Sequence, residues 1–234
     1  MIPAFVARIA RKVFPDSMIN FIRQRIPDAY FYPDYGKAFL TESKLQNLLN
    51  LLAECIEKNV EGDIIECGVF RGGSLLQFAL LAKKLNSNKK LYGIDTFEGH
   101  PYDSPNDMAP DGKIYNYKGY LVENNYERVK QIFEKRNLDE VILYKGLAEE
   151  VLLKLSREKI CFAHIDMDIY QSTKNALLLL LPMMSKNGII VFDDYGGHTT
   201  SGVKRAVEEI LNKNDVKILT NSEKDGSQAF WINR

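Results

Sequence analysis

The sequence has no excess of either charge, few cysteines and no long apolar run. Its 31 basic and 31 acidic residues cancel, whereas a general nucleic-acid binder needs a basic surface excess, so we expect no nucleic-acid partner. The three cysteines lack the spacing of zinc ligands, and their odd number argues against a disulfide framework. The longest apolar run, at 176–184, is too short to span a bilayer. Basic residues interrupt the N-terminal apolar stretch, which argues against a secretory signal. We therefore expect a cytoplasmic protein without an integral membrane segment.

The N-terminal part, residues 1–58, differs in pattern from the rest of the chain. Apolar residues at helical spacing predict a helix over 2–13, which packs on the core or on a second subunit, or rests on a membrane surface. An aromatic stretch follows at 29–39. Ser43, with Gln46 three residues later, is typical of a capping box that begins a further helix. We expect this part to shape an acceptor pocket and the protein to form a homo-oligomer.

Residues 59–234 alternate short apolar strands with helical patterns. This alternation predicts a doubly wound, mostly parallel α/β sheet. The last two strands, joined by a turn-rich segment, predict a hairpin that brings one antiparallel strand into the sheet. The predicted strands cover 63–69, 90–95, 141–146, 160–166, 188–194, 216–220 and 228–233, and the helices between them lie near 74–85, 121–136, 147–157, 171–184 and 201–212.

One long segment, residues 96–120, interrupts the alternation and is rich in Gly, Pro, Asp, Asn and Tyr. It follows the carboxyl end of the second predicted strand, the edge at which ligands of open α/β sheets bind. Loops of this length are usually functional or disordered. We predict that it forms a lid or wall over a substrate; a solvated insertion is the alternative.

The segment ECGVFRGGS, from Glu66 to Ser74, connects the first strand of the sheet to a helix. Its glycines permit a sharp turn and let a ligand approach the start of the helix. The spacing G-x-x-x-G-G differs from the G-x-G-x-x-G of dinucleotide-binding enzymes. An acidic residue such as Glu66 suits the amino or sulfonium group of S-adenosylmethionine better than it suits a pyrophosphate. A structural turn without a ligand is the alternative.

Asp95 ends the second strand. A carboxylate at this position can accept hydrogen bonds from both ribose hydroxyls of an adenosine. A nicotinamide cofactor would need the same residue, so Asp95 alone does not discriminate between the two.

Four aspartates follow two neighbouring strands: Asp166 and Asp168 at one strand end, and Asp193 and Asp194 at the next. Carboxylates that converge at one edge repel one another unless protons or a cation neutralise them. Their oxygens suit magnesium, manganese or calcium better than zinc. We predict metal ligation by Asp166, Asp193 and Asp194, whereas for Asp168 we favour capping of the helix that follows over metal ligation.

His198 lies in the loop after Asp194. Its unperturbed pKa near neutrality would let it take a proton from a substrate hydroxyl. An exposed loop histidine is the alternative, and His100 and His164 are weaker candidates. We rank Asp166 first as the base because it is placed at the metal.

Together these motifs resemble the macrocin O-methyltransferase family, over most of the chain from about Tyr35 to Trp231. The resemblance implies a Rossmann-like class I methyltransferase sheet of seven strands with the last antiparallel, S-adenosylmethionine as methyl donor, magnesium or manganese at Asp166, Asp193 and Asp194, and a sugar or glycosylated acceptor. The catalytic residues expected are Asp166 and His198. The cofactor contacts expected are Glu66, Gly68, Val69, Phe70, Arg71, Gly72, Ser74, Asp95, Thr96, Phe97, Gly146, Leu147 and Asp166.

Two other functions remain open from the sequence. A metal-dependent hydrolase on an α/β scaffold would use the carboxylates without needing the glycine turn and Asp95. A non-catalytic adenosine-binding protein would keep the cofactor site without metal or turnover.

Overall fold

The computed structural model describes residues 34–122, 124–220 and 227–234. Within these ranges seven strands form one sheet in the order β3-β2-β1-β4-β5-β7-β6. Neighbouring strands are parallel except that β7 runs antiparallel to both β5 and β6. The predicted doubly wound sheet of seven strands with its last strand antiparallel is thereby confirmed. The strands are β1 (Asp63–Cys67), β2 (Leu91–Asp95), β3 (Val141–Lys145), β4 (Ile160–Ile165), β5 (Met184–Tyr195), β6 (Lys217–Thr220) and β7 (Ser227–Ile232).

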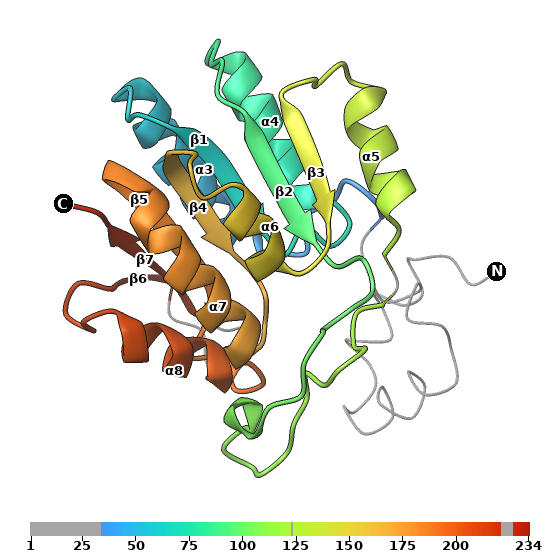
Figure 1. The fold of residues 1–234 in the computed structure, drawn as a ribbon, viewed down its shortest axis with the longest axis vertical. Coiled ribbons are helices and arrows are strands. Elements are labelled where there is room, and N and C mark those ends of the chain that lie inside the picture. The colour runs from blue at the N-terminus through green and yellow to red at the C-terminus, as the bar shows by residue number, and fades with distance from the viewer. Residues whose placement is uncertain (1–33, 123, 221–226) are drawn as a thin grey trace.

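Helices cover both faces of the sheet (Figure 1). On one face lie α3, α4 and α5, and on the other lie α6, α7 and α8. Their bounds are α3 (Glu42–Glu57), α4 (Gly73–Lys84), α5 (Tyr126–Glu134), α6 (Ala148–Lys154), α7 (Tyr170–Leu180) and α8 (Ser201–Ile210), and two 3₁₀ turns are η2 (Pro105–Asp107) and η3 (Leu181–Met183).

Two apolar cores result from the alternation of side chains along buried parallel strands. Ile64 and Leu91 pair in register and pack beneath α3 and α4, whereas the next residues, Ile65 and Tyr92, face α6 and α7. All four are almost completely buried. Burial of strand residues on both faces explains why the strands are continuous apolar runs in the sequence.

Three predicted boundaries are wrong. The N-cap of α3 is Thr41 rather than Ser43: Thr41 has extended backbone angles, and its hydroxyl accepts a hydrogen bond from the Lys44 N–H at 3.3 Å. Helix α5 begins at Tyr126, five residues after the predicted start, because Asn125 caps it. Helix α7 ends at Leu180, before the predicted end near 184. Pro182 lies in the 3₁₀ turn that follows, and β5 begins directly after that turn, at Met184.

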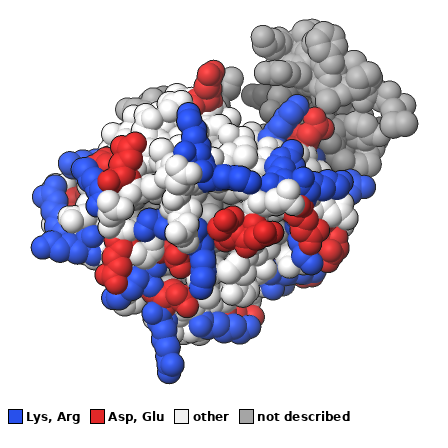
Figure 2. All heavy atoms as spheres, turned by 90° about the horizontal axis from the view of Figure 1, so that it is seen from above, with Lys and Arg blue, Asp and Glu red and all other residues white. Residues whose placement is uncertain are grey.

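Helix α3 packs on the sheet and belongs to the core through Leu48 and Leu52. The predicted helix at 2–13, residues 29–33 of the aromatic stretch and the turn joining β6 to β7 lie outside the described residues. In the ranges described, no helix combines the length and the apolar character needed to cross a membrane. Seen from above, basic and acidic side chains are interspersed on the surface (Figure 2).

The carboxyl ends of the parallel strands meet at one edge of the sheet. The segment between β2 and α5, which includes residues 96–120, extends beyond that edge (Figure 1). Open α/β sheets bind ligands at the carboxyl ends of their strands, at the point where the strand order reverses. In this sheet that point lies between β1 and β4.

Candidate functional site

A cavity of about 960 Å³ opens at this edge. Its wall combines the ends of β1, β2, β3, β4 and β5 with the start of α3 and with residues of the 96–120 segment. Its volume lies at the upper end of the range for small-molecule sites, roughly 300–1,000 Å³. One cavity therefore joins the predicted cofactor loop, the four aspartates and the predicted lid.

Gly68 fixes the path of the chain at the end of β1. Its φ is +97°, and a Cβ at this position would lie 1.7 Å from the carbonyl oxygen of Asp166. Any other residue would clash with the β4 backbone as well as strain its own. The first glycine of the motif is therefore required by the close approach of β1 to Asp166, and it forms part of the cavity wall.

Asp95 is held by three donors. Its Oδ2 accepts from the Phe70 N–H at 2.8 Å, and its Oδ1 accepts from the Phe97 N–H at 2.7 Å and from Asn124 Nδ2 at 3.3 Å. Burial raises the pKa of Asp95, and these bonds oppose the rise. Since a carboxylate has about four acceptor positions, about one remains for a further donor such as a ribose hydroxyl.

Asn124 is a wall residue that the sequence analysis missed. Its Oδ1 is buried and has no hydrogen-bond partner among the described residues, while its amide nitrogen is held by Asp95. A buried, unsatisfied acceptor beside Asp95 suits a ligand hydroxyl. No sequence pattern singles out an asparagine just before α5, so only its position reveals it.

The predicted cofactor residues divide into two groups. Those that line the cavity are Gly68, Phe70, Asp95, Thr96, Gly146, Leu147 and Asp166. Those that do not are Glu66, Val69, Arg71, Gly72, Ser74 and Phe97. Several of the second group build the turn instead: the Gly72 N–H donates to the Val69 carbonyl, and the Arg71 guanidinium lies 5.0 Å from the Tyr35 ring centre.

Glu66 is completely buried between strands. It pairs in register with His164 of β4, and its Oε1 lies 2.8 Å from His164 Nδ1. Both side chains are 0% exposed. Within the described residues, Glu66 Oε2 and His164 Nε2 have no hydrogen-bond partner. Direct contact of Glu66 with a cofactor stays a prediction, and the structure gives this carboxylate a partner in the sheet.

The four aspartates converge at the ends of β4 and β5. Ligand oxygens of Asp166, Asp168 and Asp194 all lie within 4.8 Å of one another. Asp168 and Asp194 have left-handed backbone angles, with φ of 61° and 53°. Aspartate tolerates this conformation better than most residues. The predicted metal ligands Asp166 and Asp194 both belong to this group. The third member of the group is Asp168, whereas the third predicted ligand is Asp193.

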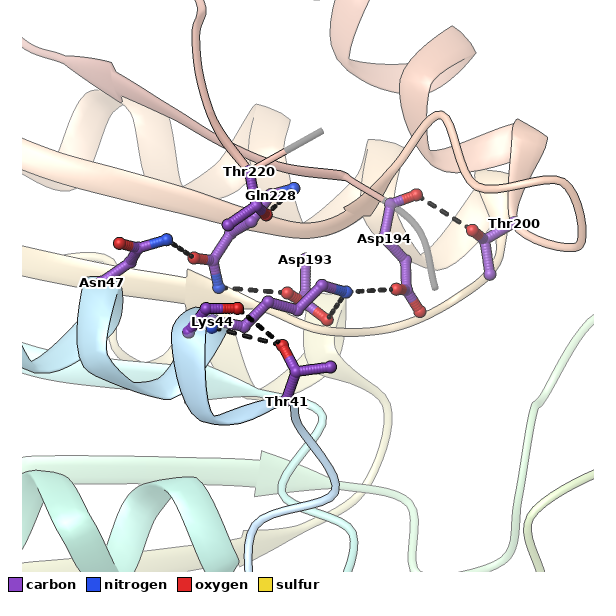
Figure 3. A network of polar contacts seen from close by, with 9 residues as sticks. Thr41, Lys44, Asn47, Asp193, Asp194, Thr200, Thr220 and Gln228 are labelled. Atoms are coloured by element: carbon purple, nitrogen blue, oxygen red, sulfur yellow. Dashed lines mark hydrogen bonds and ion pairs between the residues drawn. The ribbon is translucent and has the colours of Figure 1, made fainter. Parts of the chain in front are cut away.

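Asp193 lies beside that group with both oxygens engaged (Figure 3). Its Oδ2 is 2.9 Å from Lys44 Nζ, and its Oδ1 accepts from Gln228 Nε2 at 3.1 Å. Lys44 also reaches Asp194 Oδ1 at 2.8 Å. Lys44 and Gln228 were not singled out in the sequence; they come from α3 and β7, far from β5 along the chain.

Burial and mutual repulsion raise the pKa of the clustered carboxyls. For Asp166 the main cause is burial, followed by repulsion from Asp193, Asp168 and Asp194. For Asp168 it is burial, followed by repulsion from and a hydrogen bond with Asp194. The pKa of Asp193 is also raised, by burial and by Asp194, although Lys44 opposes the change. The cluster therefore binds protons readily, and a cation would replace them.

Residues of the 96–120 segment form the outer wall, including Tyr115, Tyr117 and Tyr120. The tip of the segment is fastened to the rest of the protein: Asp107 Oδ1 accepts from the Tyr170 N–H at 2.6 Å, and Asn116 Nδ2 donates to the Thr199 carbonyl at 3.0 Å. The segment is thus a wall over the site. Its opening and closing as a lid stays a prediction.

The two loop histidines differ in position. His198 is exposed and does not line the cavity. Its ring packs against the ring of Tyr115, with the two ring centres 5.9 Å apart. His100 does line the cavity, and its Nε2 is 3.6 Å from Asp168 Oδ2. Burial lowers the pKa of His100 to about 4. The role of His198 as a base stays a prediction.

Comparisons with known proteins agree with this geometry. Residues 12–232 match the family described as Macrocin-O-methyltransferase (TylF). The 8-demethyl-8-(2,3-dimethoxy-alpha-L-rhamnosyl)-tetracenomycin-C 4'-O-methyltransferase of Streptomyces olivaceus is 27% identical, over 86% of this chain and 77% of that protein. The demethyldecarbamoylnovobiocin O-methyltransferase of Streptomyces niveus is 26% identical over the same shares.

Two solved structures share the fold. The O-methyltransferase NovP is 25% identical with a TM-score of 0.66, over 82% of this chain and 79% of that one. The calicheamicin methyltransferase CalS11 is 19% identical with a TM-score of 0.70, over 98% and 90%.

Proposed function

This chain belongs to the macrocin O-methyltransferase family and is an O-methyltransferase, and we propose that it moves a methyl group from S-adenosylmethionine to a hydroxyl of a sugar or glycosylated small molecule with the help of a divalent metal ion. Family membership favours this reaction over a hydrolase or a non-catalytic adenosine-binding protein.

The observation that carries the proposal is the continuity of one cavity. Asp95 lines it at the end of β2, Gly68 and Asp166 line it at the adjacent ends of β1 and β4, and Asp194 lines it at the end of β5. A methyl donor held at Asp95 and Gly68 and an acceptor held near Asp194 would therefore meet in one cavity, as a transfer reaction requires.

The cofactor would be held by the ends of β1, β2 and β3. Gly68 leaves room for it, Asp95 and the unsatisfied Asn124 Oδ1 offer acceptors for ribose hydroxyls, and Gly146 and Leu147 would lie near the adenine. S-adenosylmethionine supplies a methyl group on a positively charged sulfur. These residues fit a nucleoside because they combine a backbone turn with buried acceptors at one strand edge.

The metal ion would be held by Asp166, Asp193 and Asp194, with Asp168 as the competing third ligand. The donor set is entirely carboxylate oxygen, which suits magnesium or manganese. The ammonium of Lys44 already bridges Asp193 and Asp194, so a cation position exists between them. This stand-in cation is the reason for keeping Asp193 in the proposed set.

In the reaction, the acceptor oxygen forms a bond to the methyl carbon while the carbon–sulfur bond breaks and sulfur keeps the electron pair. A bound divalent ion would lower the pKa of the acceptor hydroxyl. The hydroxyl proton passes to a carboxylate, and Asp166 is our first choice because it lines the cavity and has an oxygen within 4.8 Å of oxygens of Asp168 and Asp194. Asp168, beside His100, is the second.

The acceptor is proposed to be a neutral glycosyl compound. The Streptomyces olivaceus relative is named for methylating a rhamnosyl compound. In this chain the outer wall carries Tyr115, Tyr117 and Tyr120, and Phe39 faces the same cavity. Aromatic faces with polar edges suit the mixed apolar and hydroxyl surface of a sugar ring.

Isotope-labelled methyl transfer tests the proposal. The protein, labelled S-adenosylmethionine and fractionated extracts of the source cell would be incubated with magnesium or with a chelator. We expect label in a glycosylated small molecule in the presence of magnesium. Label confined to protein or nucleic acid would contradict the acceptor class, and equal transfer in chelator would contradict the metal.

A further inference from the structure

Lys44 is the basic residue that the structure places inside the acidic site. It lies in the first turn of α3 and is 4% exposed. Its Nζ is 2.9 Å from Asp193 Oδ2 and 2.8 Å from Asp194 Oδ1, across 149 and 150 positions of the chain (Figure 3). Lys44 also lines the cavity, together with Asp166.

The position of Lys44 has an electrostatic explanation. A buried ammonium is costly unless it is paired, and so are two adjacent buried carboxylates. Lys44 satisfies both requirements at once, because one positive charge bridges two neighbouring negative charges. Attraction to Asp193 and Asp194 outweighs burial and raises the pKa of Lys44, so the amine remains charged.

An ammonium and a metal ion cannot bridge the same two oxygens. The observed distances of 2.8 and 2.9 Å suit an ammonium, whereas magnesium requires oxygens at about 2.0–2.1 Å. The two cations would also repel each other strongly beside side chains as buried as Lys44 and Asp193.

We propose that Lys44 is the resident counter-ion of the acidic site and competes with the divalent ion for Asp193 and Asp194, thereby setting the affinity for metal. This inference rests on the metal site of the proposed function. Metal binding releases the ammonium from at least one of the two carboxylates, and Gln228 retains its bond to Asp193 Oδ1.

The competition also links the metal to the acceptor side of the cavity. Ala38, Phe39, Leu40 and Thr41, which lead directly into α3, line the same wall as Lys44. Lys44 ties this helix start to β5, so a metal ion that releases Lys44 also loosens a contact holding the wall.

Manganese binding by the full-length, chelator-treated protein tests the proposal. Lys44→Met removes the charge and keeps most of the side-chain length, while Lys44→Arg keeps the charge. Lys58→Met, at the exposed opposite end of the same helix, is the matched control. Calorimetry should show that Lys44→Met binds Mn²⁺ about ten-fold or more tightly than the wild type. Lys58→Met should match the wild type, and Lys44→Arg should not gain affinity.

Thermal unfolding gives a second readout. In chelator, Lys44→Met should unfold at a lower temperature than the wild type, because the buried carboxylate of Asp193 loses its ammonium partner. Added Mn²⁺ should raise its unfolding temperature by more than it raises that of the wild type. Wild-type affinity in Lys44→Met would overturn the competition while leaving the metal site intact. Absence of Mn²⁺ binding in both proteins would overturn the metal site of the proposed function, and this inference with it.

If Lys44→Met does not fold, the wild type still decides. In protein labelled at lysine Cε, the NMR signal of Lys44, assigned through Lys44→Arg, should move toward the position of exposed lysines as Mg²⁺ is added. Saturation with Mg²⁺, monitored by calorimetry, without movement of this signal would overturn the proposal.

Discussion

The two ends of the cavity treat buried negative charge differently. At the end of β2, Asp95 alone is held by two backbone N–H groups and one side-chain amide. At the ends of β4 and β5, four aspartates gather around one ammonium, that of Lys44. Hydrogen bonds from neighbouring N–H groups satisfy one carboxylate, but four converging carboxylates exceed what one lysine can neutralise. The first end is satisfied without an added cation, and the second is where we propose that a metal ion binds.

Removal of metal should have the largest effect. We expect chelation to lower turnover about 100-fold or more, since metal assistance contributes several kcal/mol to the barrier, and excess Mg²⁺ should restore it. Asp166→Asn, Asp193→Asn and Asp194→Asn should each lose activity and Mg²⁺ binding while remaining folded, as measured by methyl transfer, calorimetry and circular dichroism.

The exposed residue Asp139 supplies the control, because Asp139→Asn should behave as the wild type. Asp168→Asn sharpens the comparison. Loss of Mg²⁺ binding in Asp168→Asn with retention in Asp193→Asn would replace Asp193 by Asp168 as the third ligand. Full activity of the three original variants in excess chelator would refute the metal mechanism.

Gly68→Ala should give the next largest effect, on stability. Its Cβ would lie 1.7 Å from the Asp166 carbonyl oxygen, at a φ of +97°. We expect a loss of about 3 kcal/mol or more in the free energy of unfolding, measured in urea, from strain and overpacking together. Gly112→Ala isolates the strain, because Gly112 has a φ of +78° and nothing within 4 Å of its Cβ. It should lose only about 1–2 kcal/mol. Equal losses would show that the contact between β1 and β4 is unimportant.

The pH dependence of stability tests the environment of His100. Burial lowers its pKa to about 4 from an unfolded value of 6.5. The unfolded chain therefore binds more protons than the folded chain between these values, and stability is lost as pH falls from 6.5 toward 4. Over this pH range the free energy of unfolding of the wild type should fall by up to about 3 kcal/mol more than that of His100→Gln. Urea unfolding of both proteins at several pH values measures this difference. Above pH 7 the difference in free energy of unfolding between the two proteins should no longer change with pH. Parallel curves throughout would mean that His100 titrates normally.

Asp95→Ala should have the smallest effect of the four. It removes an acceptor for ribose, a charge-assisted bond of roughly 1.5–3 kcal/mol, so calorimetry should show that S-adenosylmethionine binds more weakly by about ten-fold or more. Mg²⁺ affinity should be unchanged, because Asp95 lies at the other end of the cavity. An unchanged cofactor affinity would refute the assignment of Asp95 to ribose and transfer that role to Asn124.

Local patterns were sufficient for most of the fold. Apolar strand runs and helical spacing predicted all seven strands and the helices of the α/β part, because the spacing of apolar residues within each segment reflects the faces that the segment buries. The errors in the prediction lay at the ends of helices. Thr41 and Ser43 are both good caps by type, and the choice between them depends on where the preceding backbone becomes extended. Pro182 and Asn125 shortened two helices for similarly local reasons that a periodic pattern does not detect.

By itself, the sequence determined the order of the elements, the glycine turn, and the placement of Asp95 and the four aspartates at strand ends, since each is a property of a short segment. Tertiary structure alone decided the partners. It paired Glu66 with His164 inside the sheet, brought the acceptor of Asn124 beside Asp95, and inserted Lys44 between Asp193 and Asp194. These contacts join residues from roughly 29 to 150 positions apart, so no local pattern encodes them. They arise because burial forces each polar group to find a partner, and the packing of α3 on β5 determines which partner is within reach.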